Sequence, residues 1–285
     1  TSTGDLSTAR SACAGFGIQT AAVNVSGYTN PGSVTGAAEH YNGSSWTAGG
    51  SLNTATQKTQ QACGTQTAGL AWGGDPPGGS TGSKITEEYN GSSWTASNNT
   101  NIDRSYGTRS GTQTAAVCAG GYAAITTTET YDGTSWSTSP ATMATGRRDF
   151  GGADGSDTSA FACGGNTGPA FTTATEEFSV SLVTTTAGAF SSGTNLPTEK
   201  GQGGGCGTQT AAMITGGLTA PAPGNETTTF HYDGSSWTSG GALPSGRRNN
   251  SAFGIQTAAV TLGNLNPVDA TIDVYNGSSW TGGTN

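Results

Sequence analysis

The sequence has few charged residues and few large aliphatic side chains. Only 10% of its 285 residues are charged and 48 are glycine, while Leu, Ile, Met and Lys are scarce. Gly, Ser and Thr are poor helix formers, and no stretch carries apolar residues at a spacing of 3.6, so a helical protein is not expected. Glycine follows no three-residue period, which excludes collagen. Disorder is the remaining rival, but six Trp, eight Tyr and eight Phe at regular positions argue against it.

Features of several functional classes are also missing. The formal net charge of -8 disfavours generic binding to nucleic acid or to an anionic membrane. There is no run of about 18 apolar residues that could span a bilayer, and no signal-like stretch. The five Cys are odd in number and lack CxxC spacing, so we expect buried thiols rather than a zinc site or a disulfide framework. Because the chain opens at Thr1 and not at Met, we expect it to be processed or cut from a longer protein.

Two short motifs recur at intervals of about 47 residues, a period typical of propeller blades. YNGSSW or a close variant begins at Tyr41, Tyr89, Tyr131, Tyr232 and Tyr275. GTQTAA, GIQTAA or a close variant precedes each copy and begins at Gly17, Gly64, Gly111, Gly207 and Gly254. A degenerate sixth copy has Asp157 in the second motif, Phe178 at the Tyr position and Val183 at the Trp position.

Each repeat is predicted to form four short antiparallel strands, a to d. Examples are residues 248–253 for strand a, 211–215 for strand b and 272–275 for strand c, while strand d begins at the Trp. The Asn-Gly or Asp-Gly between strands c and d predicts a type I′ turn, with positive φ at both central residues. Six copies predict a single all-β domain over residues 1–285, a six-bladed β-propeller. The expected blades are approximately residues 7–50, 51–98, 99–140, 141–192, 193–241 and 242–285. A closed ring is favoured, and a slice of a longer repeat array is the alternative.

The pattern also resembles a known family. A Gly pair ending strand b, a Tyr, a Trp soon after it and an Arg opening the next unit are similar to the kelch repeat of kelch and galactose-oxidase-like β-propellers. The resemblance covers the whole chain, although four residues separate Tyr from Trp where kelch units usually have six. The near-identical copies on a Thr, Ser and Gly background resemble repeat proteins of marine bacteriophage virions, of the tail-fibre or decoration type. Propellers host many unrelated activities, so the resemblance implies a fold more strongly than a function.

The copies differ from one another on one face of the predicted ring. The a–b and c–d turns, which we name the turn face, are nearly identical, whereas the b–c and d–a connections, the loop face, vary and hold all ten Pro. Nine of the ten Lys and Arg fall in the d–a segments or at the start of strand a, which predicts a ring of cations near the rim of the loop face. The candidate ligand-binding residues are Arg10, Lys58, Arg104, Arg109, Arg147, Arg148, Arg247 and Arg248, with Tyr28, Tyr122 and Phe171 as aromatic side chains for stacking on sugars.

Structural alternatives exist for all of these residues. Each basic residue could pair with an acid before the repeat Tyr (Glu39, Glu88, Glu129, Glu177 or Asp273) and staple blades together, and the loop aromatics could simply pack their own loops. The repeat Trp residues are expected to pack between blades. Trp72 is interpreted as core variation, and His40 and His231 as surface positions of strand c.

No group of residues predicts catalysis. Two His on separate blades provide neither a triad nor a metal site, and the neighbouring pairs Glu87-Glu88 and Glu176-Glu177 point to opposite sheet faces. We therefore expect no enzyme activity, no cofactor and no metal. The sequence favours a binding module on a virion surface or outside the cell, a tail-fibre or decoration protein that attaches to host surface glycans. A purely structural spacer or assembly protein is the alternative. The expected partners are a host glycan or other virion proteins, with homo-oligomers inside a larger assembly, and neither nucleic acid binding nor membrane insertion is expected.

Overall fold

The computed structural model describes residues 4–29, 33–57, 61–79, 81–180, 189–219, 224–264, 268 and 270–282. Within these residues the only helix is the three-residue 3-10 turn η1 (Tyr122–Ala124). None of the described helices is long and apolar enough to cross a membrane. Every other regular element is a β-strand, as the composition predicted.

Six sheets have four antiparallel strands each, and we number them in chain order. Sheet 1 contains β2 (Ala14–Ile18), β3 (Ala21–Val25), β6 (Ala38–Tyr41) and β7 (Trp46–Ala48). Sheet 2 contains β8 (Ala62–Thr65), β9 (Ala68–Trp72), β10 (Thr86–Tyr89) and β11 (Trp94–Ala96). Sheet 3 contains β12 (Ser110–Thr112), β13 (Ala115–Ala119), β14 (Thr127–Tyr131) and β15 (Trp136–Thr142).

The second half of the chain repeats this order. Sheet 4 contains β16 (Gly151–Ser156), β17 (Ser159–Cys163), β18 (Thr175–Ser179) and β19 (Ala189–Gly193). Sheet 5 contains β20 (Gly204–Thr208), β21 (Ala211–Thr215), β22 (Thr229–Tyr232) and β23 (Trp237–Ser239). Sheet 6 contains β24 (Ser251–Ile255), β25 (Ala258–Leu262), β26 (Ile272–Tyr275) and β27 (Trp280–Gly282).

The described residues form seven sheets rather than six. The seventh is small and three-stranded, with the order β1 (Arg10–Ser11), β4 (Tyr28–Thr29) and β5 (Ser33–Val34). It arises because the b–c connection of the first unit folds back on the start of its own strand a. The six repeats therefore account for the six four-stranded sheets, and an extended loop accounts for the seventh.

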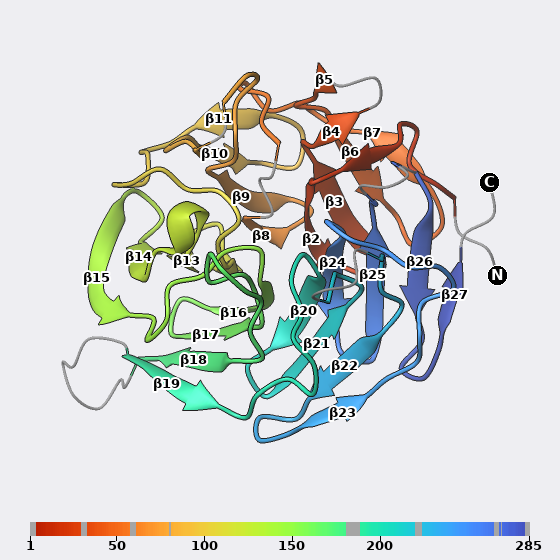
Figure 1. The fold of residues 1–285 in the computed structure, drawn as a ribbon. Coiled ribbons are helices and arrows are strands. Elements are labelled where there is room, and N and C mark those ends of the chain that lie inside the picture. Colours follow the sequence, from red (N-terminus) through yellow and green to blue (C-terminus); the bar gives the residue numbers. More distant parts are fainter. Residues whose placement is uncertain are drawn as a thin grey trace.

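The four-stranded sheets surround a common centre (Figure 1). Their first strands (β2, β8, β12, β16, β20 and β24) are innermost, and each contacts the next, with β24 contacting β2 to close the ring. Each of these sheets is formed by one continuous segment of the chain, as the repeats predicted, and in sheet 1 that segment also contains β4 and β5 of the small sheet.

A pair of aromatic rings in each unit fills the space between sheets. The repeat Tyr and Trp are partners in the register of strands c and d, as Tyr89 and Trp94 are. The Trp also packs on the neighbouring sheet: the ring centres of Trp94 and Phe16 lie 6.2 Å apart. Trp72 is 1% exposed, and its ring centre lies 5.1 Å from that of Trp136, which confirms its place in the core. All five Cys are buried with free thiols, as expected, and burial raises the pKa of Cys163 to about 12.

Two local predictions were wrong. In sheet 4 the ring paired with Phe178 is Phe190, not Val183, because residues 180–188 separate strands c and d there; Val183 itself lies outside the described residues. The c–d turn is not type I′, since four residues lie between the closing Tyr and Trp. Only its Gly has positive φ, 93° at Gly43, while the Asn42 side chain accepts hydrogen bonds from the backbone N–H of Ser44 and Ser45.

Three kinds of side-chain hydrogen bond tie neighbouring sheets together. The Gln of the GxQT turn, which we name the Gln latch, donates to carbonyls of the preceding sheet: Gln66 Nε2 lies 3.0 Å from Ala22 O and 2.8 Å from Tyr41 O. The repeat Trp of units 2, 3, 5 and 6 donates its indole N–H, as Trp136 does to Thr86 Oγ1 at 3.0 Å. The repeat Tyr bonds through its hydroxyl, as Tyr232 does to Glu177 Oε1 at 2.6 Å.

Each of the two His lies against the repeat Tyr of the next sheet. His40 Nε2 lies 2.5 Å from the Tyr89 hydroxyl, and the His231 ring contacts the Tyr275 ring edge-on. Their interpretation as surface positions was therefore wrong, because both rings are half-buried against the Tyr of the next sheet. Burial lowers the pKa of each imidazole below its usual value.

Candidate functional site

Four of the predicted cations lie in the interior rather than on the rim of the loop face. Arg10, Arg104, Arg147 and Arg247 are at most 1% exposed. Their ion-pair partners are Glu39, Glu129, Glu176 and Asp273, respectively. The partner acid stands two residues before the repeat Tyr or Phe in all four units, and the pleat of strand c turns that position toward the Arg. Glu88 and Glu177, one residue before it, point the other way and accept from Tyr hydroxyls, so their assignment as Arg partners was wrong.

Each buried Arg also donates to backbone carbonyls beneath its own b–c connection. Arg104 donates from Nε and Nη2 to Glu129 Oε2 at 3.0 and 2.8 Å, and from Nη1 to Gly120 O and Thr127 O at 2.7 and 3.0 Å. A buried charge needs such compensation. These four residues therefore form ion pairs with acids of strand c, as the structural alternative predicted. Each ion pair joins the d–a segment to its own sheet and not to a neighbouring one.

Units 2 and 5 depart from this pattern. Lys58, a candidate binding residue of unit 2, lies outside the described residues. In unit 5, Lys200 takes the Arg position and is 0% exposed, while Phe230 takes the position of the acid. Lys200 Nζ donates to Gly216 O at 2.5 Å and to Thr228 Oγ1 at 2.6 Å. Burial lowers the pKa of this ammonium to about 8.

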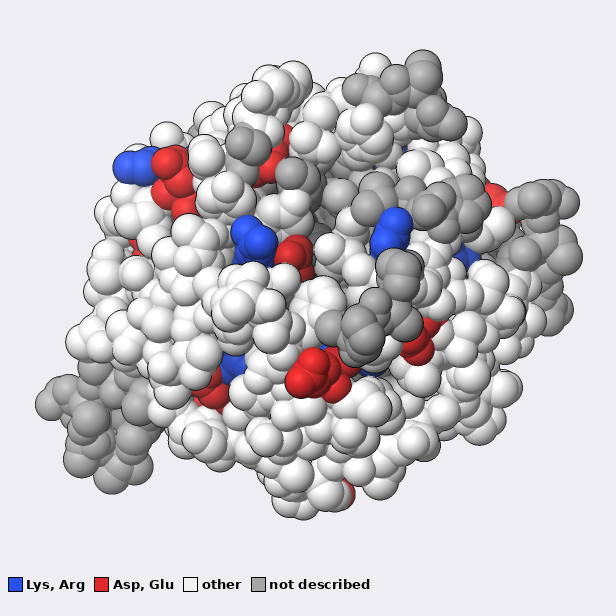
Figure 2. Space-filling view, viewed as in Figure 1, with Lys and Arg blue, Asp and Glu red and all other residues white. Residues whose placement is uncertain are grey.

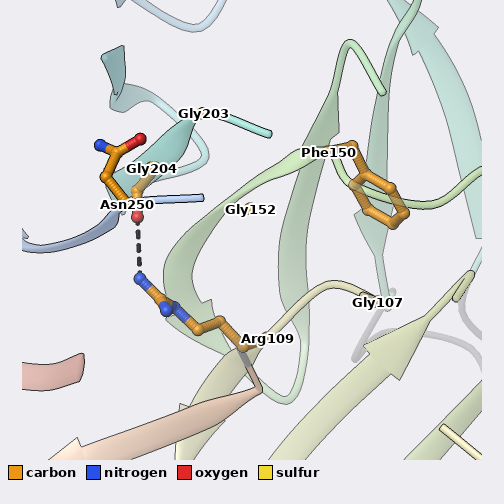
Figure 3. Close-up of a pocket in the computed structure, with 8 residues that line it drawn as sticks. Gly107, Arg109, Phe150, Gly152, Gly203, Gly204 and Asn250 are labelled. Carbon is orange, nitrogen blue, oxygen red and sulfur yellow. Dashed lines mark hydrogen bonds between the residues drawn. The ribbon is translucent and has the colours of Figure 1, made fainter. Parts of the chain in front are cut away.

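Arg109 crosses the centre of the ring (Figure 3). Its side chain leaves sheet 3 just before β12, and Nη2 donates to Gly205 O of β20 at 3.1 Å and to Ala252 O of β24. It is 5% exposed and borders a cavity of about 20 Å³, room for about one water molecule, together with Phe150, Gly203 and Asn250. Arg109 was predicted on the rim, and it instead spans the centre of the ring.

A ring of left-handed residues surrounds this central cavity on the loop face. Ala12, Tyr106, Asp149, Gln202 and Asn249 have φ between 49° and 60°, and each lies two residues after the basic residue of its unit. We name them the left-handed ring. Their backbones are joined around the centre: Asp149 N donates to Tyr106 O (3.1 Å), Gln202 N to Asp149 O (2.7 Å), Asn249 N to Gln202 O (2.8 Å) and Ala12 N to Asn249 O (3.3 Å).

Side chains at these positions carry a conformational penalty. For residues other than Gly, the left-handed region costs about 1–2 kcal/mol, and less for Asn and Asp. This chain places Gly at most other positive-φ positions, yet the left-handed ring has Tyr, Asp, Gln and Asn. Residues held in strained backbone conformations cluster at functional sites. These residues were not predicted as site residues, although the sequence shows that the second residue after the basic one differs from copy to copy.

Buried polar atoms near the left-handed ring have no protein partner. They are Gln202 Oε1, Asn249 Oδ1, Asn250 Oδ1, Ser105 Oγ and both amide atoms of Gln61. Buried polar atoms are normally hydrogen-bonded, so such a group points to bound water or a polar ligand. Asp149 and Asn249 are each 8% exposed, which leaves a narrow approach from the loop face.

Two of the predicted binding residues meet beside this ring. The guanidinium of Arg148 lies 5.6 Å from the centre of the Tyr122 ring, and its Nε lies 3.7 Å from Asp149 Oδ2. Its side chain is 31% exposed, unlike that of the adjacent Arg147. Arg248 is half-buried at the equivalent position of unit 6. The face seen in Figure 2 shows a few small basic patches with acidic patches among them, not a continuous ring of cations.

The other two aromatic candidates are placed apart from this group. Tyr28 lies in β4 of the small sheet, half-buried and paired with Val34. The ring of Phe171 covers Gly201, so closely that a Cβ there would lie 2.3 Å from the ring. Tyr28 therefore belongs to a sheet formed by its own loop, whereas the ring of Phe171 packs on the start of unit 5.

On the turn face, the GxQT turns of five units surround an apolar depression of about 380 Å³. Ile18 and Ile255 stand at its edge with 56% and 52% of their surfaces exposed. Its lining is nearly the same in each contributing unit, in contrast with the left-handed ring.

Comparison with known proteins supports the fold and leaves the activity open. No protein-family model matches the chain, and no curated protein matches its sequence. Among solved structures, the chain is similar to one titled "Structure of YjhT", with a TM-score of 0.76 over 98% of this chain and 99% of that one. The fold is a β-propeller. At 12% identity, this likeness shows the fold alone.

Proposed function

We propose that this propeller is a non-enzymatic, kelch-like binding module of a virion surface or the extracellular space, a tail-fibre or decoration protein that attaches to host surface glycans. The single observation that carries the proposal is the left-handed ring. Four of its five described members keep a polar side chain at a strained position around the centre of the variable face.

The chemistry of this site fits an uncharged or weakly acidic sugar. Amide, carboxylate and phenol groups exchange hydrogen bonds with hydroxyls, and Gln202 Oε1 and Asn249 Oδ1 have acceptor capacity that no protein group uses. The guanidinium of Arg148, placed over Tyr122, offers charge-assisted hydrogen bonds to an anionic substituent at the edge of the site. The four interior Arg have no part in binding, since each is at most 1% exposed and forms an ion pair within the protein.

Replacement by Gly tests the proposal, because it removes the side chain and the strain together. The Gln202→Gly/Asn249→Gly variant should bind an array of bacterial surface polysaccharides at least tenfold more weakly than the unaltered protein. Its free energy of unfolding should rise by about 1 kcal/mol or more. Ala12→Gly is the matched control, since it relieves the same strain in the same ring and should leave binding unchanged.

A second variant examines the charged edge. Arg148→Ala should weaken binding to acidic polysaccharides and leave neutral ones unaffected. If the unaltered protein binds the array and the double Gly variant binds equally well, the site is elsewhere. If the unaltered protein binds no polysaccharide, the structural alternative, a spacer or assembly protein, gains support.

A further inference from the structure

One of the six interfaces between neighbouring sheets lacks the Gln latch. Five interfaces have it: Gln19 donates to Tyr275 O (2.8 Å), Gln66 to Tyr41 O (2.8 Å), Gln113 to Tyr89 O (2.8 Å), Gln209 to Phe178 O (3.5 Å) and Gln256 to Tyr232 O (2.8 Å). In three of these, the same Nε2 also reaches the carbonyl of the residue paired with that Tyr, at 2.8–3.2 Å. Between sheets 3 and 4, Asp157 takes the place of the Gln.

Asp157 cannot perform the same task. An ionised carboxylate accepts hydrogen bonds and donates none. The two carbonyls that the latch would bind belong to Ala116 and Tyr131, which are paired in the register as Ala22 and Tyr41 are at the first interface. No side-chain donor among the described residues reaches either carbonyl, and the Asp157 carboxylate makes no hydrogen bond within the described part of the chain. This interface thus has the two carbonyls and a carboxylate, all acceptors, whereas the other interfaces have a Gln amide as the donor.

The same interface also lacks the other two kinds of tie. Phe178 replaces the Tyr, so the hydroxyl is missing, and Phe190 replaces the Trp, so the indole N–H is missing. A cleft of about 440 Å³ opens here on the turn face, lined by Thr114, Tyr131, Asp132, Asp157 and Thr158 among others. Among the described residues, the side-chain hydrogen bonds that remain between the two sheets come from Ser110 Oγ, which donates to Ser156 O or Ser159 O at 3.1 Å.

We propose that this cleft binds a primary ammonium group, which would take the place of the missing Gln amide. Three of the other interfaces show that a nitrogen donor fits between the two carbonyls at 2.8–3.2 Å. An ammonium has three N–H donors for the two carbonyls and the carboxylate, and its charge is complementary to that of Asp157. Ca²⁺ fits less well, because it prefers oxygens at about 2.3–2.6 Å. Moreover, no cluster of three His, Cys, Asp or Glu suited to a metal occurs in the described residues.

Small amines test the proposal by isothermal titration calorimetry. The probes are D-glucosamine and Nα-acetyl-lysine methylamide, which separate an amino sugar from a lysine side chain, with N-acetylglucosamine as the neutral control. We expect at least one amine to bind, and N-acetylglucosamine to bind at least tenfold more weakly than the amino sugar if the latter is the ligand. Binding of neither amine, or equal binding of the neutral sugar, would overturn the proposal.

Two variants locate the site. Asp157→Gln restores the latch seen at the other five interfaces, so it should abolish amine binding and raise the thermal midpoint of unfolding. Gln113→Asp makes the reciprocal change between sheets 2 and 3, and should lower the midpoint. Amine binding that Asp157→Gln leaves intact would place the ligand elsewhere and refute the assignment. The cleft is on the face opposite the left-handed ring, so neither result depends on glycan binding at the loop face.

Discussion

Lys200 gives the sharpest test of the buried ion pairs, because it is a buried cation whose unit has Phe230 where the other five units have an acid. Burial lowers its pKa from 10.5 to about 8, with a smaller opposing effect of Glu226. Between pH 8 and 10.5 the unfolded chain keeps this proton and the folded protein has released it. The free energy of unfolding contributed by Lys200 therefore rises with pH across this window, and the destabilisation is complete below pH 8.

The size of this effect follows from the two pKa values. Each unit of pKa corresponds to 1.36 kcal/mol, so protonated Lys200 destabilises the fold at pH 7 by about 3 kcal/mol relative to pH 11. The Lys200→Met variant has no such titration. Its free energy of unfolding minus that of the unaltered protein should accordingly fall by about 3 kcal/mol between pH 7 and pH 10.5. The lost hydrogen bonds to Gly216 O and Thr228 Oγ1 shift this difference by a constant and leave its slope unchanged.

Guanidinium chloride unfolding at pH 7, 8, 9, 10 and 10.5 measures this difference. A comparison of variants is needed because the buried Cys titrate in the opposite sense: burial raises the pKa of Cys13, Cys118 and Cys163 to about 11 or 12, so their contribution to stability declines as pH rises above 9. Lys84→Met is the control, since Lys84 is exposed, and its difference from the unaltered protein should stay flat. A flat difference for Lys200→Met as well would refute the reasoning and show that the protein solvates this ammonium as water does.

Three further predictions concern stability, and equilibrium unfolding at pH 7 checks each. Arg104→Ala should cost about 3–5 kcal/mol because it leaves Glu129 charged and buried, whereas the double variant Arg104→Met/Glu129→Met should cost less than the single one. Gln256→Ala removes two hydrogen bonds between sheets 5 and 6 and should cost about 1–3 kcal/mol; no loss would mean that water replaces the latch. Gly205→Ala should cost about 1–3 kcal/mol or more, since its Cβ would lie 2.5 Å from Gly152 O where β16 and β20 approach each other; a neutral result would show that the centre of the ring can widen.

The sequence predicted strand positions well because the motifs mark the ends of strands. Strand b at Ala211–Thr215 and strand c at Ile272–Tyr275 were predicted to the residue, and strand d does begin at the repeat Trp in the five units that have one. Strand a, expected at residues 248–253, was placed too early, since β24 is Ser251–Ile255 and the residues before it include a member of the left-handed ring and the buried Arg. The prediction of Val183 as the partner of Phe178 was wrong in the unit whose c–d connection is longer. There the spacing no longer indicates which residue pairs with Phe178, and the partner is Phe190. Motif counting thus succeeds where the copies are alike and fails where one has an insertion.

The candidate site could not be predicted to the same extent. A basic residue next to a predicted loop is expected at the surface. Only the structure shows that Arg104 points inward and donates to carbonyls beneath its own b–c connection. Sequence alone does not indicate a positive φ at Tyr106, Asp149, Gln202 or Asn249, because Gly is the residue that predicts a positive φ and these positions have other residues. The exchange of Gln for Asp157 was visible in the sequence, but its meaning required knowing which carbonyls the Gln reaches.

Each four-stranded sheet is formed by one continuous segment of the chain, and this arrangement affects how such a protein can evolve. Leu6 N donates to Ala270 O, so the first and last units lie against each other, and the described strands of the two units belong to separate sheets. A gene whose units were rotated in order would encode the same ring of sheets. Recombination between copies can therefore replace one unit with its loops while the other five keep their folds, and the loop face can diversify one unit at a time.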